Sequence, residues 1–273
     1  MVKEIINKFF NKNTSYLIKY GFISLILVIC IIQFAIHSQA SSGPSNELLA
    51  WGFKRGQDNS QPVLDRNSKK VVEKYNGIAM GNPERKYLYL TFDAGYEAGY
   101  TEKILQVLKD NNVPAAFFLA GHYLNSASDM VKKMIENGHI VANHTVNHKN
   151  LVNLNEEEIK KEVMDLHNAL YEKFGYEMKY FRPPKGEFSE RTTEVTNSLG
   201  YISVLWSSAY DDWDKNKQGR EEYGKKKIMD NLHNGCVILL HSTSKDNAEI
   251  LDDVIKEAKK MGYEFRSLDK FER

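Results

Sequence analysis

The sequence contains very little cysteine. Only two cysteines, Cys30 and Cys236, occur in 273 residues, and they lie in different regions of the chain. This distribution excludes a disulfide framework and a zinc site built from cysteines. Cys236 lies in an apolar run, where we expect a small buried side chain.

The sequence also lacks an excess of charge and several common catalytic signatures. Its net charge of +1 gives no overall attraction to nucleic acid, so none is expected as a partner. The chain has no glycine-rich phosphate loop, no serine elbow and no catalytic-cysteine pattern. With 27% charged and 11% aromatic residues, its composition is that of a globular protein. Its length allows one large α/β domain or two small ones.

The N-terminal part has the pattern of an exported protein. Residues 1–19 are basic, and the apolar segment 20–37 is just long enough to span a bilayer. The basic flank places the N-terminus in the cytoplasm and the remainder of the chain outside the membrane. We therefore predict a single-pass membrane anchor, with cleavage after Ala40 and secretion as the alternative. Residues 38–83 are predicted to form a linker and an extended arm.

Strand and helix patterns alternate from residue 84 to residue 273. The helices are predicted from residue 101, near 128–137, from 155, from 189 to 200, near 221–232 and at 247–260. Alternating βα units indicate a parallel sheet, either open or closed into a barrel. Seven strands are one fewer than in the regular barrel. The strands are predicted at 87–93, 115–119, 139–143, 180–182, 201–206, 236–241 and 263–266.

Asp93 stands at the end of the first predicted strand. The stretch YLYLTFDAGYEAGY, residues 87–100, has a strand pattern up to Phe92, followed by Asp93. An unpaired carboxylate at the end of a buried strand is costly. The carboxyl ends of parallel strands also carry the chemistry of many α/β enzymes. Asp93 is therefore a candidate catalytic residue, although an aspartate that caps the next helix would equally account for it.

Other functional side chains follow the later strands. His144 and His148 come after the third strand and, if this segment is helical, their imidazoles share one face and can bind one cation. Arg182, Asp212 and His241 come at or after three further strands, and an imidazole can donate a proton near neutral pH. Each has an ordinary alternative, such as a surface turn or a solvated loop. Their recurrence at successive strand ends predicts a metal-assisted hydrolase.

Five ordered motifs in this part of the chain resemble those of a known family. The family is the polysaccharide deacetylases with the NodB homology domain, also called carbohydrate esterase family four. The resemblance covers residues 84–273 and implies an α/β fold, a distorted and incomplete (β/α)7 barrel of the NodB glycoside hydrolase/deacetylase type. The motifs are TFDAG at 91–95, HTVNH at 144–148, RPPKG at 182–186, DDW at 211–213 and LLH at 239–241.

Longer matches resemble one branch of that family. TFDAGYEAGYT, GHYL, FRPPKGEFSER and LLHSTSKDNAE are similar to the PdaA branch, the δ-lactam-biosynthetic de-N-acetylases of spore-forming bacteria. This resemblance implies removal of acetyl groups from N-acetylmuramic acid in the glycan strands of peptidoglycan. It also implies later cyclisation to the muramic δ-lactam of the spore cortex. We expect a monomer.

The resemblance also implies roles for individual residues. Asp93 would be the general base, with Arg182 paired to it. His144 and His148 would hold a divalent metal ion, with Zn²⁺ as the first expectation and Mn²⁺, Co²⁺ or Mg²⁺ as alternatives. His241 would protonate the leaving nitrogen. The remaining residues are assigned to supporting roles: Asp212 to orienting the catalytic acid, and Lys185 and Trp213 to contacts with the substrate or the oxyanion.

The sequence departs from the family pattern at two positions. Most members have a second aspartate directly after the base, and it completes the set of metal ligands, whereas this chain has Ala94. Two imidazoles without a carboxylate should hold a cation weakly. Lys185 stands where an aromatic residue is common. Two alternatives therefore remain: a deacetylase of chitin-like or other N-acetylated glycans, and a catalytically silent protein that binds the cell wall.

Overall fold

The computed structural model describes residues 28–29 and 43–273. The predicted basic segment 1–19 lies outside the described residues, and the predicted apolar segment 20–37 is described only at residues 28–29. Within the described ranges, no helix is both long enough and apolar enough to cross a bilayer. Residues Asn46–Arg273 form one compact unit, to which the following description applies.

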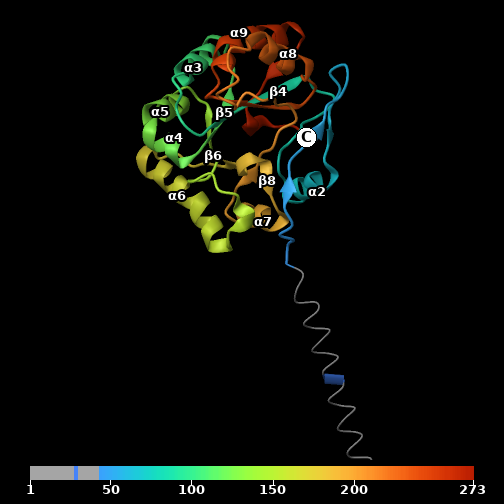
Figure 1. Ribbon diagram of the computed structural model, residues 1–273, viewed down its shortest axis with the longest axis vertical. Helices are drawn as coiled ribbons and strands as arrows, with labels where there is room; N and C mark the ends of the chain where they lie inside the picture. Colours follow the sequence, from blue (N-terminus) through green and yellow to red (C-terminus); the bar gives the residue numbers. More distant parts are fainter. Residues whose placement is uncertain (1–27, 30–42) are drawn as a thin grey trace, which may run out of the picture. The chain divides into compact units, whose positions relative to one another are not determined.

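A parallel sheet of seven strands lies at the centre of this unit (Figure 1). All its strand pairs are parallel, as the sequence predicts. The first predicted strand is β4 (Tyr87–Ala94), and it is almost wholly buried. The order across the sheet is β10 (Cys236–His241), β4, β5 (Ala115–Leu119), β6 (Ile140–Asn143), β7 (Tyr180–Phe181) and β9 (Ile202–Ser203), with β11 (Glu264–Phe265) also paired to β4.

The sheet curls until its two outer strands nearly meet. Beyond β9, Ser208 forms a parallel bridge with Ile238 of β10. Near the same edge, Ile78 forms a parallel bridge with Val204. A curled parallel sheet that closes only through such single bridges fits the predicted distorted, incomplete barrel.

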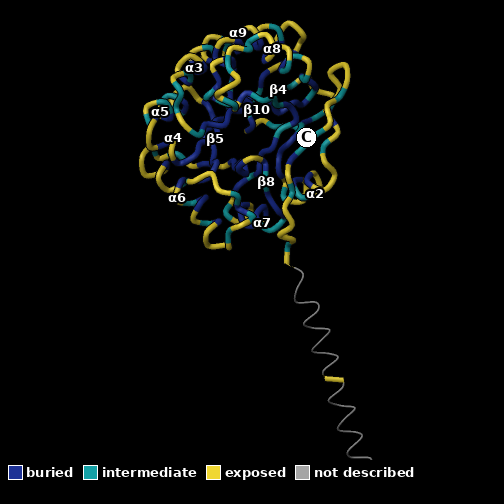
Figure 2. Tube along the Cα trace, viewed as in Figure 1, coloured by how far each residue is buried: buried dark blue, intermediate teal, exposed yellow. Residues whose placement is uncertain are grey.

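Helices cover the outside of the sheet, and their inner faces are buried whereas their outer faces are exposed (Figures 1 and 2). In α3, Ile104 and Leu108 are fully buried, and burial of each such side chain contributes about 1.5–3 kcal/mol. The helix α6 begins with the predicted capping box, formed by Asn155 and Glu158. The helices are α3 (Thr101–Asp110), α4 (Gly121–Ser126), α5 (Ser128–Glu136), α6 (Glu156–Phe174), α7 (Glu190–Ser198), α8 (Glu221–Asp230) and α9 (Lys245–Lys260).

The segment before β4 is more regular than the sequence indicates. It contains β1 (Leu49–Ala50), which pairs with β8 (Glu187–Phe188), and a small hairpin of β2 (Phe53–Lys54) and β3 (Val63–Leu64). It also contains the helix α2 (Arg66–Lys74), which the sequence analysis missed. This helix has nine residues and its stripe is limited to Val71 and Val72, too short a pattern to detect. Asp65 caps it by accepting a hydrogen bond from the Ser68 N–H.

Candidate active site

The candidate residues from five parts of the chain meet at the carboxyl end of the sheet. Asp93 of β4 and His241 of β10 are directly paired in register, so neighbouring strands present a carboxylate and an imidazole to one pocket. The pocket has a volume of about 590 Å³. Its lining includes Asp93, Gly95, Tyr96, His144, His148, Lys185, Trp206, Tyr210, Trp213, Leu239 and His241.

Asp93 is held by a buried arginine. The Nη1 of Arg182 donates to Asp93 Oδ1 at 2.6 Å, and its Nη2 donates to Thr91 Oγ1 at 2.9 Å. The Nε of Arg182 donates to the Val204 carbonyl at 3.0 Å, so the guanidinium is fixed on three sides. Burial raises the pKa of Asp93, but the charge and hydrogen bond of Arg182, together with His144 and His241, outweigh it, and the net pKa lies below the usual value. Asp93 is therefore an ionised, oriented carboxylate at neutral pH.

The capping alternative for Asp93 does not hold. The helix α3 begins at Thr101, and its N-cap residue is Tyr100, which makes no side-chain capping bond. The carboxylate of Asp93 instead faces Arg182 and, at 3.5 Å, the Nε2 of His144.

The segment through His144 and His148 is not helical, so the helical condition under which their imidazoles would share one face is not met. The segment after β6 is an irregular turn in which Thr145 and His148 have φ angles of 67° and 54°. Such angles are unusual for a β-branched residue. The turn nevertheless brings the two imidazoles together, with ring centroids 4.8 Å apart. The HxxxH spacing thus places both rings at one site by a strained turn and not by helical periodicity.

Neighbouring polar groups hold this turn. Asn143 Oδ1 accepts a hydrogen bond from the Thr145 N–H, and Thr145 Oγ1 accepts one from the His148 N–H, both at 2.9 Å. Glu162 of α6, which is buried, accepts from both the backbone N–H and the side-chain amide of Asn147, at 2.9 and 2.8 Å. Glu162 does not stand out in the sequence, because it is one of many charged residues on α6.

His144 is prepared to bind a cation. Its Nδ1 lies 2.8 Å from the Arg182 carbonyl, so Nδ1 carries the proton and Nε2 faces the pocket. Burial lowers the pKa of His144 to about 4, which leaves the ring neutral, the form that ligates metals. The pair of His144 and His148 therefore fits the divalent cation that the family resemblance implies. Within the described residues, no group of three or more His, Cys, Asp or Glu could hold a metal ion.

Ala94 lies on the opposite side of the strand from the pocket. It is fully buried in the hydrophobic core with Leu90 and Phe92, whereas Thr91 and Asp93 alternate to the inner face. No side chain at the end of β4 takes the place of the missing carboxylate. The departure noted in the sequence therefore remains in the structure.

His241 is held by a second ion pair. Its Nδ1 lies 2.8 Å from Asp212 Oδ1, and its backbone N–H donates to Asp212 Oδ2 at 2.7 Å. The Nδ2 of Asn247 donates to the same carboxylate at 2.6 Å. Burial lowers the pKa of His241, but the charge and hydrogen bond of Asp212, together with the charge of Asp93, outweigh this, and the net pKa lies above the usual value of 6.5. Asn247, in the first turn of α9, carries no signal in the sequence that would mark it as a partner of Asp212.

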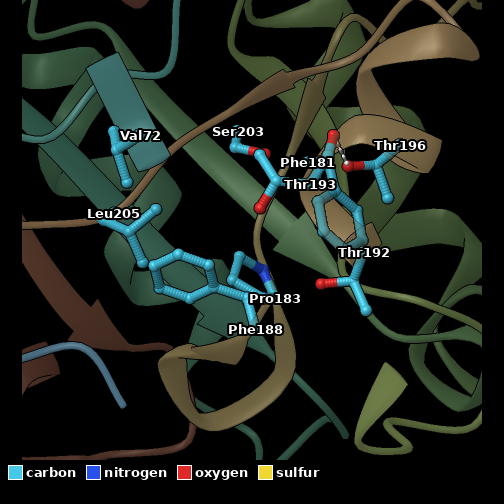
Figure 3. Close-up of a pocket in the computed structure, with 9 residues that line it drawn as sticks. All are labelled: Val72, Phe181, Pro183, Phe188, Thr192, Thr193, Thr196, Ser203 and Leu205. Atoms are coloured by element: carbon cyan, nitrogen blue, oxygen red, sulfur yellow. Dashed lines mark hydrogen bonds between the residues drawn. The ribbon is translucent and has the colours of Figure 1, made fainter. Parts of the chain in front are cut away.

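The RPPKG turn is built on a packed base. Figure 3 shows Phe181, Pro183 and Phe188 beside the threonines of α7, around a cavity of only about 10 Å³. Lys185 adopts a left-handed conformation, with φ of 59°, and its side chain is exposed. Within the described residues no acceptor takes the Lys185 N–H. This N–H is therefore available to donate a hydrogen bond to an oxyanion, the role that the family resemblance implies for Lys185. Trp213, the second predicted substrate residue, lies at the rim and is 64% exposed.

The chain is similar to known polysaccharide deacetylases. Residues 80–204 match the family described as polysaccharide deacetylase. The chain is 40% identical over 233 residues to the peptidoglycan-N-acetylmuramic acid deacetylase PdaA of Bacillus subtilis. This alignment covers 85% of this chain and 88% of that protein. It is 33% identical over 201 residues to a peptidoglycan-N-acetylglucosamine deacetylase of Bacillus cereus, with 72% of each chain covered. The structure of Bacillus subtilis PdaA, a family 4 carbohydrate esterase, matches with a TM-score of 0.81 at 39% identity, over 83% of this chain and 97% of that one.

Proposed function

Because the chain belongs to the polysaccharide deacetylase family, we propose that it removes the N-acetyl group from N-acetylmuramic acid in peptidoglycan strands. The observation that carries this proposal is the pair of oppositely tuned groups on neighbouring strands. Arg182 favours the ionised form of Asp93 by lowering its pKa, and Asp212 favours the protonated form of His241 by raising its pKa. Amide hydrolysis needs a base to activate water and an acid to protonate the leaving nitrogen.

Asp93 takes the proton from the attacking water. Its Oδ1 is occupied by Arg182, so Oδ2, beside His144, is the oxygen that remains to accept a proton. A divalent cation bound by His144 and His148 would polarise the amide carbonyl and lower the pKa of the water. The Lys185 N–H donates to the oxygen that becomes negatively charged as the carbonyl carbon turns tetrahedral.

His241 then gives a proton to the nitrogen as its bond to the carbonyl carbon breaks. Asp212 accepts the hydrogen bond from Nδ1, so the acidic proton is on Nε2, the nitrogen on the far side of the ring. The products are acetate and the free amine of the sugar. Without this proton the leaving group would be an amide anion, which is a very poor one.

The muramic assignment is supported by the relative from Bacillus subtilis and by Lys185. N-acetylmuramic acid carries a lactyl ether whose carboxylate is free when no stem peptide is attached, whereas N-acetylglucosamine lacks it. The exposed Lys185 ammonium lines the pocket and provides a cation for that carboxylate. We expect Lys185→Gln to reduce the preference for the muramic sugar, whereas Lys132→Gln, at an exposed lysine of α5 that is not part of the pocket lining, should not.

Two other functions compete with this proposal. The similarity to the N-acetylglucosamine deacetylase of Bacillus cereus favours the same reaction on other N-acetylated sugars. The alanine at position 94 favours a silent protein that binds the wall. A silent protein has no need of a base and an acid that each keep their charged partners, and this argues for an enzyme.

One experiment separates the three functions. The protein is incubated with peptide-free and peptide-bearing peptidoglycan fragments, with added Zn²⁺, Mn²⁺, Co²⁺ or Mg²⁺ and with a chelator, and the products are analysed by mass spectrometry. The proposal requires loss of acetyl from the muramic residue. Acetyl loss only from N-acetylglucosamine would support the first alternative, and no loss with any metal would support the second. Zn²⁺ binding to wild type and to His148→Ala, measured by calorimetry, tests the histidine pair independently of activity.

We also propose the cellular context. The freed amine can attack the lactyl carboxyl group and form the six-membered δ-lactam with loss of water, the modification expected for a spore cortex. The segment 20–37 would hold the catalytic unit outside the membrane or direct its secretion. Cell fractionation during sporulation and muropeptide analysis of spores from a deletion strain test these points. A cortex with unchanged lactam content would contradict the first.

A further inference from the structure

The N-terminal arm, residues 46–65, reaches the active site although it lies outside residues 80–204, the part of the chain that matches the family. Its strand β1 pairs antiparallel with β8, the strand that directly follows the RPPKG turn (Figure 1). Trp51 comes next along the arm, and its side chain is only 9% exposed. The arm therefore contacts a turn that the proposed mechanism uses.

Trp51 connects two segments that line the active-site pocket. Its backbone N–H donates to the Gly186 carbonyl, and its indole Nε1 donates to the Trp206 carbonyl, both at 2.8 Å. Lys185, directly before Gly186, and Trp206 both line the pocket, whereas among the described residues Trp51 does not belong to that lining. One residue outside the pocket thus ties the turn that presents the Lys185 N–H to the segment after β9.

The RPPKG turn has little room to move away from Trp51. A Cβ on Gly186 would lie 2.8 Å from the ring of Trp206 and 3.0 Å from the Cβ of Trp51, so Gly186 is held between two tryptophans. Trp51 also packs in a small hydrophobic cluster with Phe188 and Leu205, which lie side by side in Figure 3. The turn can relax only if several packed side chains move with it.

The backbone of Lys185 needs such support. Its φ of 59° is unfavourable for a residue with a side chain, and such a conformation persists only where the surrounding structure enforces it. Relaxation to an ordinary negative φ would reorient the peptide groups of the turn. A hydrogen bond weakens steeply when its donor is misaligned, and a donor to an oxyanion acts mainly in the transition state.

We propose that Trp51 is a positioning residue for the reaction. It holds the RPPKG turn so that the Lys185 N–H points at the oxyanion, and it does so without touching the substrate. The inference rests on the proposed function, because it takes the Lys185 N–H to be the donor to that oxyanion. It adds that the catalytic unit includes the N-terminal arm.

Two variants of Trp51 and one control test this role. Trp51→Ala removes the ring and its donor, whereas Trp51→Phe keeps an aromatic ring and removes only the Nε1 donor. The matched control is Leu64→Ala, on β3, because Leu64 packs on the same cluster but has no hydrogen bond to the turn. The arm keeps a separate attachment in all three variants, since the Gln61 side chain donates to the Gly81 and Asn234 carbonyls at 2.9 Å.

The measurements separate positioning from a loss of stability. For the full chain, kcat and KM are determined on a peptide-free muramic substrate. Calorimetry gives the affinity for an analogue in which a methylphosphonamidate replaces the acetamido group, and for the deacetylated product. The analogue has a tetrahedral centre with a charged oxygen, and the product has neither. Hydrogen exchange over residues 183–188, followed by mass spectrometry, reports the order of the turn independently of activity.

We expect Trp51→Ala to lower kcat about tenfold and to weaken analogue binding about tenfold, with KM and product affinity within about twofold of wild type. The turn should exchange faster. Trp51→Phe should show the same changes to a smaller extent, and it is the deciding variant if Trp51→Ala does not fold. Leu64→Ala should keep the wild-type kcat, analogue affinity and exchange.

Three results would overturn the proposal. One is an unchanged analogue affinity in both Trp51 variants, and another is an equal loss of analogue and product affinity, which would indicate a contact with the sugar. The third is the same set of changes in Leu64→Ala, which would indicate a general loss of packing. An absence of turnover by the wild type would refute the proposed function, whereas the analogue affinities and exchange rates would still decide the role of Trp51.

Discussion

Replacement of Asp212 by asparagine should separate the acid half of the site from the base half. The carboxylate of Asp212 accepts hydrogen bonds from the ring of His241, from the backbone N–H of His241 and from Asn247, at 2.8, 2.7 and 2.6 Å. Asparagine keeps one acceptor oxygen and introduces an NH₂ group, which must face at least one of these donors. Each lost hydrogen bond to a charged group is worth about 1.5–3 kcal/mol.

The expected result is a lower rate and a displaced pH profile. General acid catalysis contributes about 10²- to 10⁴-fold, so we expect kcat of Asp212→Asn to fall by a factor within this range. His241 must be protonated to act, so activity is lost as pH rises through its pKa. Asp212 raises that pKa above 6.5, and its replacement should therefore move the alkaline limb of kcat/KM to lower pH. The acid limb, set by the lowered pKa of Asp93, should stay in place.

The neighbouring residue provides the matched control for this experiment. Asp211 carries the same side chain but interacts with Tyr223 and Arg220, away from His241. Asp211→Asn should keep both limbs of the profile and most of kcat. An unmoved alkaline limb in Asp212→Asn, with kcat near that of wild type, would show that His241 is not the catalytic acid.

Three further predictions concern the base, the histidine turn and the RPPKG turn. Arg182→Met leaves the Asp93 carboxylate buried without its partner, so the free energy of unfolding measured with urea should fall by about 3–5 kcal/mol. The acid limb of the pH profile should shift to higher pH. An unchanged urea midpoint would contradict this prediction. Glu162→Gln replaces an acceptor with a donor that faces an N–H of Asn147. We expect kcat/KM to fall about tenfold and the Asn147 amide hydrogen to exchange faster with solvent. Unaltered hydrogen exchange would exclude the role given to Glu162. Gly186→Ala should lower the thermal unfolding temperature more than Gly138→Ala does. Both glycines have a positive φ, but only at Gly186 would the new Cβ meet an aromatic ring, that of Trp206 at 2.8 Å. Equal losses of stability would mean that the contact with Trp206 relaxes freely.

The sequence predicted which side chains meet at the edge of the sheet better than it predicted their local structure. The alternation of βα units gave the parallel sheet, and a parallel sheet places the ends of its strands at one edge. That is why Asp93 and His241, 148 positions apart by number, were expected together and are paired in register. The segment at His144, considered as a possible helix, is a turn instead, because the Asn143 and Glu162 side chains stabilise a conformation that local periodicity does not encode.

What the sequence alone determined is the order of the strands along the chain, the chemistry at each strand end and the absence of a carboxylate at position 94. These depend on residue type and on patterns within a few positions. Only the tertiary structure decided that Arg182 and Asp212 each tune a partner far away in sequence, that Ala94 faces the core, and that Trp51 contacts the RPPKG turn. Pairing of buried charges and the support of a turn depend on residues from separate elements, and their distances are set only when the sheet curls and the helices pack on it.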